Sequence, residues 1–122
     1  MSSPSGAFSW NSELPNGHSP FWINDDALAG LGLHVGDAVS VDTSVEPHDG
    51  DLVVVEAEVE GDSLRLARRL FHAGERLRLE GTRGNDDHEV LEIDADAVIV
   101  MGVIVARLHF SANGDKATEA AL

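Results

Sequence analysis

Histidines and carboxylates are the residues of this chain that could do chemistry, and their spacing argues against a metal site. The six histidines are scattered, with no pair at the helical or hairpin spacing of metal ligands, and the chain has no cysteine. The acidic run Asp86–Glu89, with Asp94 and Asp96 after it, lacks the alternating aspartates, the glycine and the closing glutamate of a calcium loop. We therefore predict solvated histidines, a solvated acidic loop, and no metal or other cofactor.

Two aspartates follow glycine at the start of β-branched runs, in Gly36-Asp37 and Gly50-Asp51. Two carboxylates can form an acid–base pair. An aspartate just before a strand, however, ordinarily accepts hydrogen bonds from the backbone of its own turn. We therefore predict a structural role for Asp37 and Asp51.

Most of the chain has the pattern of β-strands. Residues 38–41 and 52–59 are β-branched runs that each begin after a turn signal. After turn residues at 60–63, apolar residues alternate with arginines over 64–70, which predicts a hairpin with 52–59. Over 76–80 the leucines face one way and the arginines the other. These runs predict an antiparallel meander.

Two further elements are expected. The apolar run 97–108, interrupted by Gly102, predicts one long or two short buried strands with a bend or bulge at the glycine. A single helical turn is expected at Ala27–Ala29, because the capping side chains of residues 24–26 precede it and Gly30 would end it.

The ends of the chain differ from its middle. Residues 1–20 are rich in Ser, Pro, Gly and Asn, with isolated aromatics such as Trp10, and predict an extended arm that docks in places. Residues 111–122 are polar and alanine-rich, and predict a flexible tail or a short frayed helix. The 122 residues are enough for one domain, which we place at 21–110.

The chain is strongly acidic, with 22 acidic and 8 basic residues, a net charge of -14, and Lys116 as its one lysine. Such a surface repels phosphate, and the arginines are better suited to pair with carboxylates, so we expect no direct binding of nucleic acid. Acid excess with so little lysine also indicates adaptation to high salt. No apolar stretch approaches the roughly 20 residues of a membrane helix, and we expect a cytoplasmic protein.

The order of the motifs resembles the peptidase domain of the LexA/UmuD family. Phe21–Leu28 followed by Gly32–Asp37 is similar to the family's Gly-Asp-Ser-Met or Gly-Met-Ser-Met segment and the Gly-Ile-x-x-Gly-Asp after it, with the spacing kept. Leu66–Leu70 resembles the family's Val-Lys-Arg-Leu, and Ile99–Val105 its penultimate strand. The resemblance covers about residues 21–110. It implies a mainly β fold of twisted antiparallel strands around a small barrel-like core.

The family cuts with a serine nucleophile and a lysine base, and the resemblance implies that both are missing. Ala27 stands at the serine position, and either Ala67 or Arg68 at the lysine position, depending on how many residues the preceding hairpin inserts. A methyl group cannot attack a carbonyl, and arginine holds its proton too firmly to act as a base. The resemblance therefore implies a domain that binds but does not cleave.

Two alternatives keep an enzyme. A relocated dyad would combine Ser40 or Ser44 with Lys116, which lies outside the resemblance. In the second alternative, Ala27 and Ala67 are engineered substitutions in a genuine autoprotease. Asp25, where the family has a small glycine, does not fit that purpose.

The family's self-cleavage bond has a weak analogue here. Ser5-Gly6 is the nearest match to its Ala-Gly or Cys-Gly bond, but it is closer to Ala27 than the family's loop allows. The chain is therefore interpreted as the already shortened form.

Partners follow from the same resemblance. Members of the family form dimers, and UmuD-like proteins modulate a lesion-bypass polymerase, which implies a homodimer with a polymerase or repressor as a further partner. We expect the interface on an exposed edge of the run 97–108, because an unpaired apolar edge seeks a partner. A third interpretation is the C-terminal half of a repressor whose DNA-binding domain is on another chain.

Overall fold

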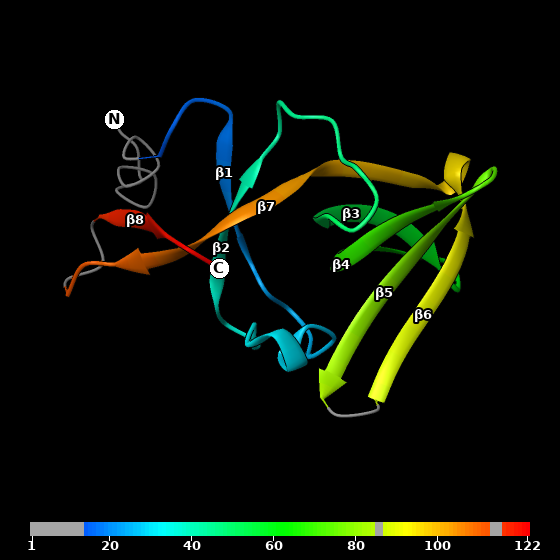
Figure 1. Ribbon diagram of the computed structural model, residues 1–122, viewed down its shortest axis with the longest axis horizontal. Helices are drawn as coiled ribbons and strands as arrows, with labels where there is room; N and C mark the ends of the chain where they lie inside the picture. Colours follow the sequence, from blue (N-terminus) through cyan, green and yellow to red (C-terminus); the bar gives the residue numbers. More distant parts are fainter. Residues whose placement is uncertain (1–13, 85–86, 113–115) are drawn as a thin grey trace.

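The computed structural model describes residues 14–84, 87–112 and 116–122 (Figure 1). The chain forms strands β1 His18–Trp22, β2 Ala38–Asp42, β3 Leu52–Val59, β4 Asp62–Ala73, β5 Arg76–Gly84, β6 Asp87–Asp94, β7 Val98–Phe110 and β8 Ala117–Ala120, and the 3-10 turns η2 Ala29–Leu31 and η3 Ala95–Ala97. All the strand pairs are antiparallel. The prediction of a mainly β fold is confirmed.

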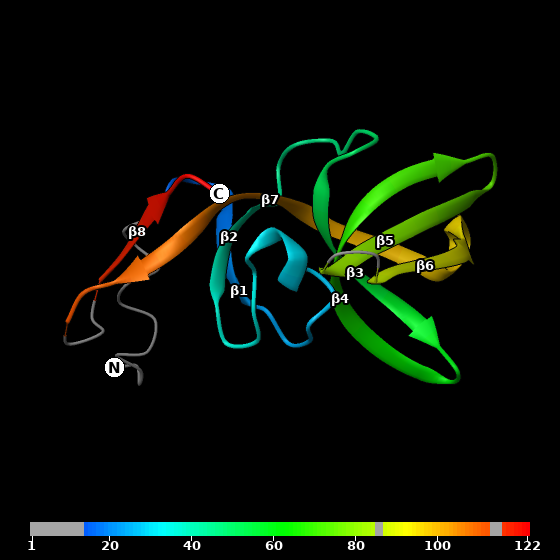
Figure 2. The same ribbon diagram turned by 60° about the horizontal axis from the view of Figure 1, so that its bottom comes forward.

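Strand β7 holds the sheet together. The strands pair in the order β1-β2-β7-β3-β4-β5-β6, and β8 pairs with the last residues of β7. In Figures 1 and 2, β7 runs from the group of β1, β2 and β8 to the hairpins formed by β3 to β6. The expected exposed edge on residues 97–108 is therefore wrong. Within this run β3 pairs with Val98–Val103 and β2 with Val103–Arg107, so each half of β7 has a strand partner within the sheet.

Gly102 makes the central position of β7 possible. Val54 pairs with Gly102 and Val55 with Val100, so Met101 is bulged out of the ladder, as the sequence predicts. A Cβ on Gly102 would lie 2.6 Å from Val41 Cγ1 and 2.7 Å from the carbonyl oxygen of Asp42. The glycine is thus needed because β2 approaches the backbone of β7 closely.

Two hydrophobic clusters form the core. The first contains Ile23, Leu28, Leu33, Val39, Val41, Val54, Ala67 and Ile104. The second contains Val53, Val55, Leu66, Leu70, Leu77 and Leu79. Neighbouring residues of β3 therefore contribute to different clusters, since side chains of a strand alternate between its two faces. The predicted orientation of Leu77 and Leu79 toward one face is confirmed.

The helical turn lies later than predicted. It spans Ala29–Leu31 and ends at Gly32, whose φ is 84°. The expected capping side chains bond elsewhere: Asn24 donates to the carbonyl of Arg65 at 2.9 Å, and Asp25 accepts from the backbone N–H of Ala27 at 3.2 Å. Gly30 does not end the turn. A Cβ there would lie 2.7 Å from the carbonyl oxygen of Thr82, so this glycine allows the turn to pack on β5.

Strands extend into three segments that were expected to be irregular. The predicted tail contains β8, and the predicted arm contains the start of β1. Most of the predicted acidic loop is β6, in which Leu91 and Ile93 pack on the second cluster. Alternation of acidic with apolar residues, and not the density of charge, was the informative signal there. Residues 1–13, with Trp10 and Ser5-Gly6, lie outside the described part of the chain.

Candidate functional site

Ala27 lies between β1 and η2 and is completely buried, with 0% of its surface exposed. Its carbonyl oxygen accepts a hydrogen bond from the backbone N–H of Thr82 on β5 at 2.6 Å. On the same strand, a Cβ at Gly81 would lie 2.9 Å from the Ala27 methyl carbon. The methyl group is therefore enclosed against the backbone of β5.

A carboxylate joins the Ala27 loop to β4. Asp25 Oδ1 accepts from the Ala27 N–H and from Arg68 Nη1, each at 3.2 Å, and Asp25 Oδ2 accepts from Arg68 Nη2 at 2.9 Å. Two guanidinium nitrogens thus bind the two oxygens of one carboxylate, the strongest geometry for this pair. Of the two residues placed at the lysine position, Arg68 brings a polar group here, whereas Ala67 packs in the first cluster with Leu28.

The ion pairs continue beyond Asp25. Arg68 Nε donates to Glu89 Oε1 at 2.7 Å, and Arg83 donates to Glu89 Oε2 at 3.2 Å and to Asp26 Oδ1 at 2.7 Å. These five residues, Asp25, Asp26, Arg68, Arg83 and Glu89, are called the Arg68 network below. Hydrogen bonds to Asp26 and then Glu89 raise the pKa of Arg83 above its usual value, and keep it charged.

The Arg68 network differs from a surface ion pair because its central guanidinium is buried. The Arg68 side chain is only 5% exposed, while Asp25 and Glu89 are 33% and 32% exposed. A guanidinium that leaves water so completely must be paired, and here two carboxylates satisfy it. A pocket of about 370 Å³ opens at the network, and its other lining residues include Leu64, Leu66 and Val90. The arrangement offers a surface for binding, but its cation cannot accept a proton.

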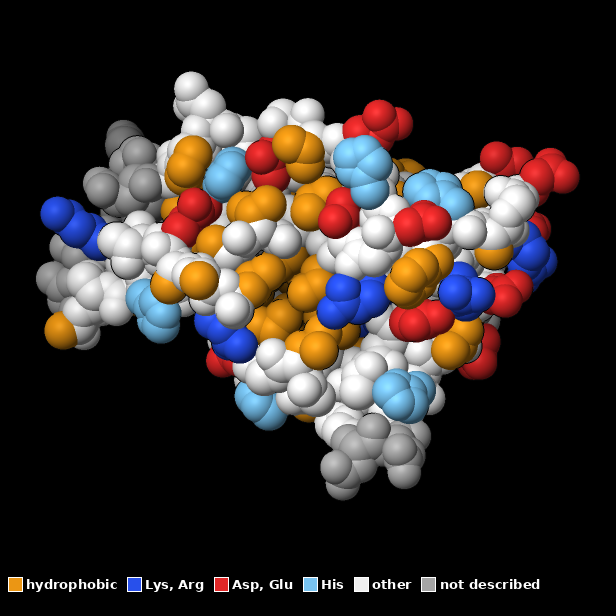
Figure 3. Space-filling model, in the orientation of Figure 1, with side chains coloured by type: hydrophobic (Ala, Val, Ile, Leu, Met, Phe, Trp, Pro, Cys, Tyr) orange, Lys and Arg blue, Asp and Glu red, His pale blue; other side chains and the backbone are white. Residues whose placement is uncertain are grey.

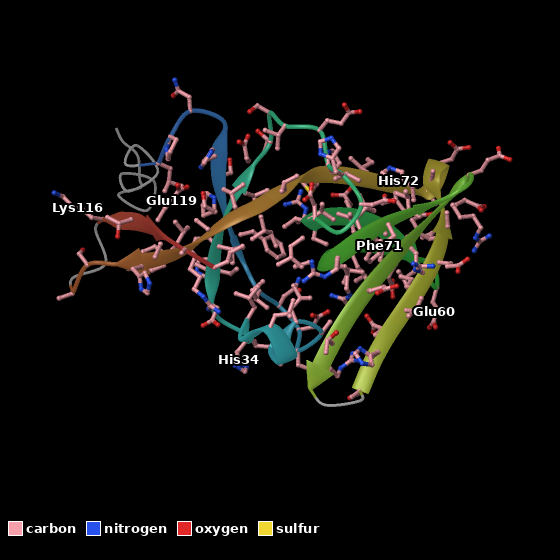
Figure 4. All side chains as sticks on the ribbon, in the orientation of Figure 1. His34, Glu60, Phe71, His72, Lys116 and Glu119 are labelled. Atoms are coloured by element: carbon pink, nitrogen blue, oxygen red, sulfur yellow. The ribbon has the colours of Figure 1, made fainter. Side chains whose placement is uncertain are left out.

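A second polar cluster involves a histidine, a serine and two carboxylates. His18 Nδ1 lies 2.6 Å from Glu119 Oε2, and His18 Nε2 lies 3.3 Å from Asp42 Oδ2. The Ser40 hydroxyl donates to Glu119 and lies 3.3 Å from His18 Nδ1. Figure 4 labels Glu119 on β8, close to β1 and β2. We call this group the His18 cluster.

The composition of the His18 cluster matches that of a serine hydrolase, but its geometry does not. Ser40 is 0% exposed in the middle of β2, between Pro20 of β1 and Ala106 of β7. Its hydroxyl donates a hydrogen bond to the carboxylate of Glu119. A serine nucleophile would instead have to donate to the imidazole, which would act as its base. Ser44 also donates to a carboxylate, that of Asp42, at 2.6 Å. The cluster ties three strands together.

Charge favours the protonated imidazole in this cluster. The hydrogen bond with Glu119 raises the pKa of His18 above its usual value, against the effect of burial. Burial would raise the pKa of Glu119, but hydrogen bonds from Ser40 and His18 outweigh it and lower that pKa. Hydrogen bonds from Ser44 lower the pKa of Asp42, and His18 adds to this effect. All three shifts favour the state in which a protonated imidazole lies between two carboxylates.

Comparison with known proteins agrees with this architecture. A family model described as Peptidase S24-like matches residues 2–105. The LexA repressor of Deinococcus radiodurans is 33% identical over 90 residues, which are 74% of this chain and 41% of that protein. The chain belongs to the Peptidase S24-like family. The resemblance to LexA/UmuD-type peptidases is thereby confirmed, and this S24-like chain spans about two fifths of that LexA repressor's length.

Other expectations for this S24-like domain have mixed outcomes. Asp37 and Asp51 accept the backbone N–H of His34 and His48, each at 2.8 Å, which confirms their structural role. The prediction of solvated histidines is wrong for His18. Among the described residues, no three His, Cys, Asp or Glu side chains are grouped to hold a metal ion, and no helix is long and apolar enough to cross a membrane.

Several residues of the two clusters were not predicted. Arg83 and Glu89 lie near the hairpin of β5 and β6, far in sequence from Asp25, and no spacing rule connects them. Glu119 lies in the segment expected to be a tail. One signal was present: in Ala117-Thr118-Glu119-Ala120 the first and third residues share a face, and Ala117 is fully buried.

The first prediction concerns the Arg68 network. Arg68→Met keeps an aliphatic stem but leaves Asp25 and Glu89 facing each other without their cation, so unfolding free energy should fall by about 2 kcal/mol, given the partial exposure of both carboxylates. Arg65→Met on the same strand is the matched control, because Arg65 is 59% exposed and pairs with Glu56. Its loss should be within about 0.5 kcal/mol. Urea denaturation of both variants provides the comparison, and equal losses would contradict the prediction.

The second prediction concerns pH. Because the pKa of His18 is raised, its stabilising effect is complete below the usual histidine value of 6.5 and is lost as pH rises through the folded-state pKa. Because the pKa of Glu119 is lowered, its effect is complete above the usual value of 4.5 and is lost as pH falls through the folded-state pKa.

The stability difference between the wild type and His18→Gln should therefore be largest between about pH 5 and pH 6, and smaller near pH 8. Thermal unfolding of both proteins across this range measures it. His34→Gln, which removes an exposed histidine outside the His18 cluster, is measured alongside as the control. A His18→Gln difference that is constant with pH would contradict the assigned charge state.

Proposed function

We propose that this S24-like chain is a non-catalytic member of its family that acts by binding other proteins. The observation that carries the proposal is the pair of residues at the positions of the family's dyad. By the family resemblance, the enclosed methyl of Ala27 stands for the nucleophile, and either the doubly paired guanidinium of Arg68 or the methyl of Ala67 stands for the base. None of these groups can supply the step for which the family needs it.

The surroundings favour natural loss of the dyad over an engineered one. A substitution made to inactivate an enzyme would explain an alanine at position 27, but it would not explain the acids that surround Arg68. Asp25 binds Arg68 through both oxygens, and Glu89 binds both Arg68 and Arg83. A charge network of this kind fits a sequence that has adapted to an arginine at position 68.

The third prediction separates these two histories. We expect that Ala27→Ser with Arg68→Lys does not react with a fluorophosphonate probe, and that the same holds with Ala67→Lys in place of Arg68→Lys. A lysine at 68 would lie between Asp25 and Glu89, which favour its charged form, and a serine at 27 would be enclosed against Gly81. Intact-mass spectrometry detects labelling without requiring a cleavable bond. Labelling of the serine at 27 at mildly alkaline pH would support the engineered autoprotease instead.

The interaction proposed is a homodimer formed through β8. Among the strands of the described residues, three have a single partner in the sheet: β1, β6 and β8. β1 contains Pro20, and β6 carries four acidic residues, two features that discourage pairing with another chain. β8 has no proline and a single charged residue, Glu119. The edge of β8 therefore has less of either kind of protection than β1 or β6.

Exposed aromatic rings next to β8 support this choice. Trp22 and Phe110 stack with their ring centroids 6.3 Å apart, although they are 45% and 39% exposed. Phe110 pairs with Ala117, so the stack lies beside the first residue of β8. Large aromatic side chains near an open strand edge are typical anchors of protein interfaces. A repressor or a lesion-bypass polymerase, the partner classes that the family resemblance implies, would be bound by the resulting dimer.

The fourth prediction tests β8. In an antiparallel pair of β8 strands, Thr118→Glu adds one carboxylate on each chain near the symmetry axis, and should weaken dimerisation by about tenfold or more. Thr43→Glu is the matched control, because both threonines are exposed and both donate to a backbone carbonyl. Size-exclusion chromatography with light scattering at low and high salt gives the masses. A wild type that is monomeric in both conditions, or two variants that behave alike, would count against a β8 dimer.

A further inference from the structure

A pocket of about 410 Å³ lies away from both polar clusters, between η2, the start of β3 and the middle of β7. Its apolar lining consists of Leu31, Leu33, Leu52, Val103, Ile104 and Leu122. In Figure 3 a hydrophobic hollow occupies the centre of the face shown, with a basic side chain on either side. The volume is within the range of pockets that hold small molecules.

Two arginines, Arg69 and Arg107, line the same pocket. Arg69 Nη1 donates a hydrogen bond to the carbonyl oxygen of Gly50 at 2.6 Å. Arg107 donates to the carbonyl of Gly32 at 3.0 Å and lies 3.8 Å from a carboxylate oxygen of Asp37. A guanidinium has five N–H donors, so each side chain keeps donors available beyond these contacts.

Arg69 differs from the other arginines. Arg65, Arg68, Arg76, Arg78, Arg83 and Arg107 each have a carboxylate oxygen at a closest distance between 2.7 and 3.8 Å. Within the described residues Arg69 has no ion pair, in a chain with 22 acidic residues. Asp51 also lines the pocket, where its carboxylate accepts the backbone N–H of His48 at 2.8 Å and forms no ion pair with Arg69. Among the described residues, the guanidinium of Arg69 therefore lies at an apolar hollow without a carboxylate in ion-pair distance.

We propose that this pocket binds a small aliphatic monocarboxylate, with the carboxylate on Arg69 and the hydrocarbon chain on the leucine and valine side chains. A single guanidinium without an ion pair among the described residues fits one anionic group, and its planar fork matches the two oxygens of a carboxylate. The apolar lining contains no aromatic ring, which favours a flexible aliphatic chain over a flat ring that would stack. Arg107 is placed to provide a second donor.

This site is independent of the proposed function. The pocket at the Arg68 network is lined by Asp25, Arg68 and Glu89, and none of these lines the pocket at Arg69. Arg68 and Arg69 are neighbours on β4, but their side chains point to opposite faces of the strand. Loss of the ligand site would therefore leave the interpretation of Ala27 and Arg68 unchanged.

Titration of the intact chain by two-dimensional amide NMR tests the proposal, with octanoate as the probe. Octanoate should shift the amide signals of Leu33, Leu52 and Val103. Two control probes, 1-octanol, which lacks the charge, and acetate, which lacks the chain, should each bind with an affinity lower by about tenfold or more. Arg69→Gln should weaken octanoate binding by about tenfold. Arg65→Gln, on the same strand but outside this pocket, should leave binding unchanged.

Three results would overturn the proposal. One is equal binding of octanol and octanoate, because the charge of Arg69 would then play no part. Another is an equal loss of affinity in Arg69→Gln and Arg65→Gln, which would indicate general attraction of anions. The third is a set of shifts that lies outside the pocket, or no shift at all. If Arg69→Gln fails to fold, the comparison of the three probes on the wild type still decides.

Discussion

The pairing of β7 with three other strands is the constraint on which the rest of the structure depends. Gly102 allows β2 to approach, and the bulge at Met101 lets the same strand pair first with β3 and then with β2. This places the two hydrophobic clusters on the two sides of one continuous sheet. The loop that holds Ala27 is then brought against β5, and β8 is brought against the end of β7. Both polar clusters are consequences of that arrangement.

Much of this fold could be predicted from the sequence, because a β-branched run that begins at a Gly-Asp turn is recognisable as a strand from a few neighbouring residues. The errors arise because such short-range signals carry no information about which distant segments come into contact. The apolar run of β7 was read as an exposed edge because a sequence pattern shows that a strand is buried, but not which strands bury it. The strand β8 was missed because its four residues have weak propensity, and its stability comes from distant contacts of Ala117 and Glu119.

The candidate site shows a similar division. Position 27 and the neighbouring positions 67 and 68 could be singled out from the sequence because the order and spacing of the family's motifs are kept. The partners of Arg68 were not, because an ion pair needs proximity in space and leaves no spacing in the chain. Asp25 is the instructive case: the sequence marked it as a departure from the family's glycine, and the structure explains it as the bidentate partner of the buried guanidinium. A residue that departs from a family pattern thus indicates where to look for a contact specific to this chain.

Scarcity of basic residues makes their placement informative in this protein. With 8 basic residues against 22 acidic ones, an arginine finds a carboxylate nearby almost wherever it lies on the surface. Most of these ion pairs are exposed and contribute little to stability. Arg68 differs because it is buried, and burial requires its acids. Arg69 differs in the opposite sense, since it has no ion pair with any carboxylate in the described part of the chain. Two adjacent residues of β4 therefore represent the two ways in which a cation in an acidic protein can acquire a specific role: one in holding the fold, the other in holding a ligand.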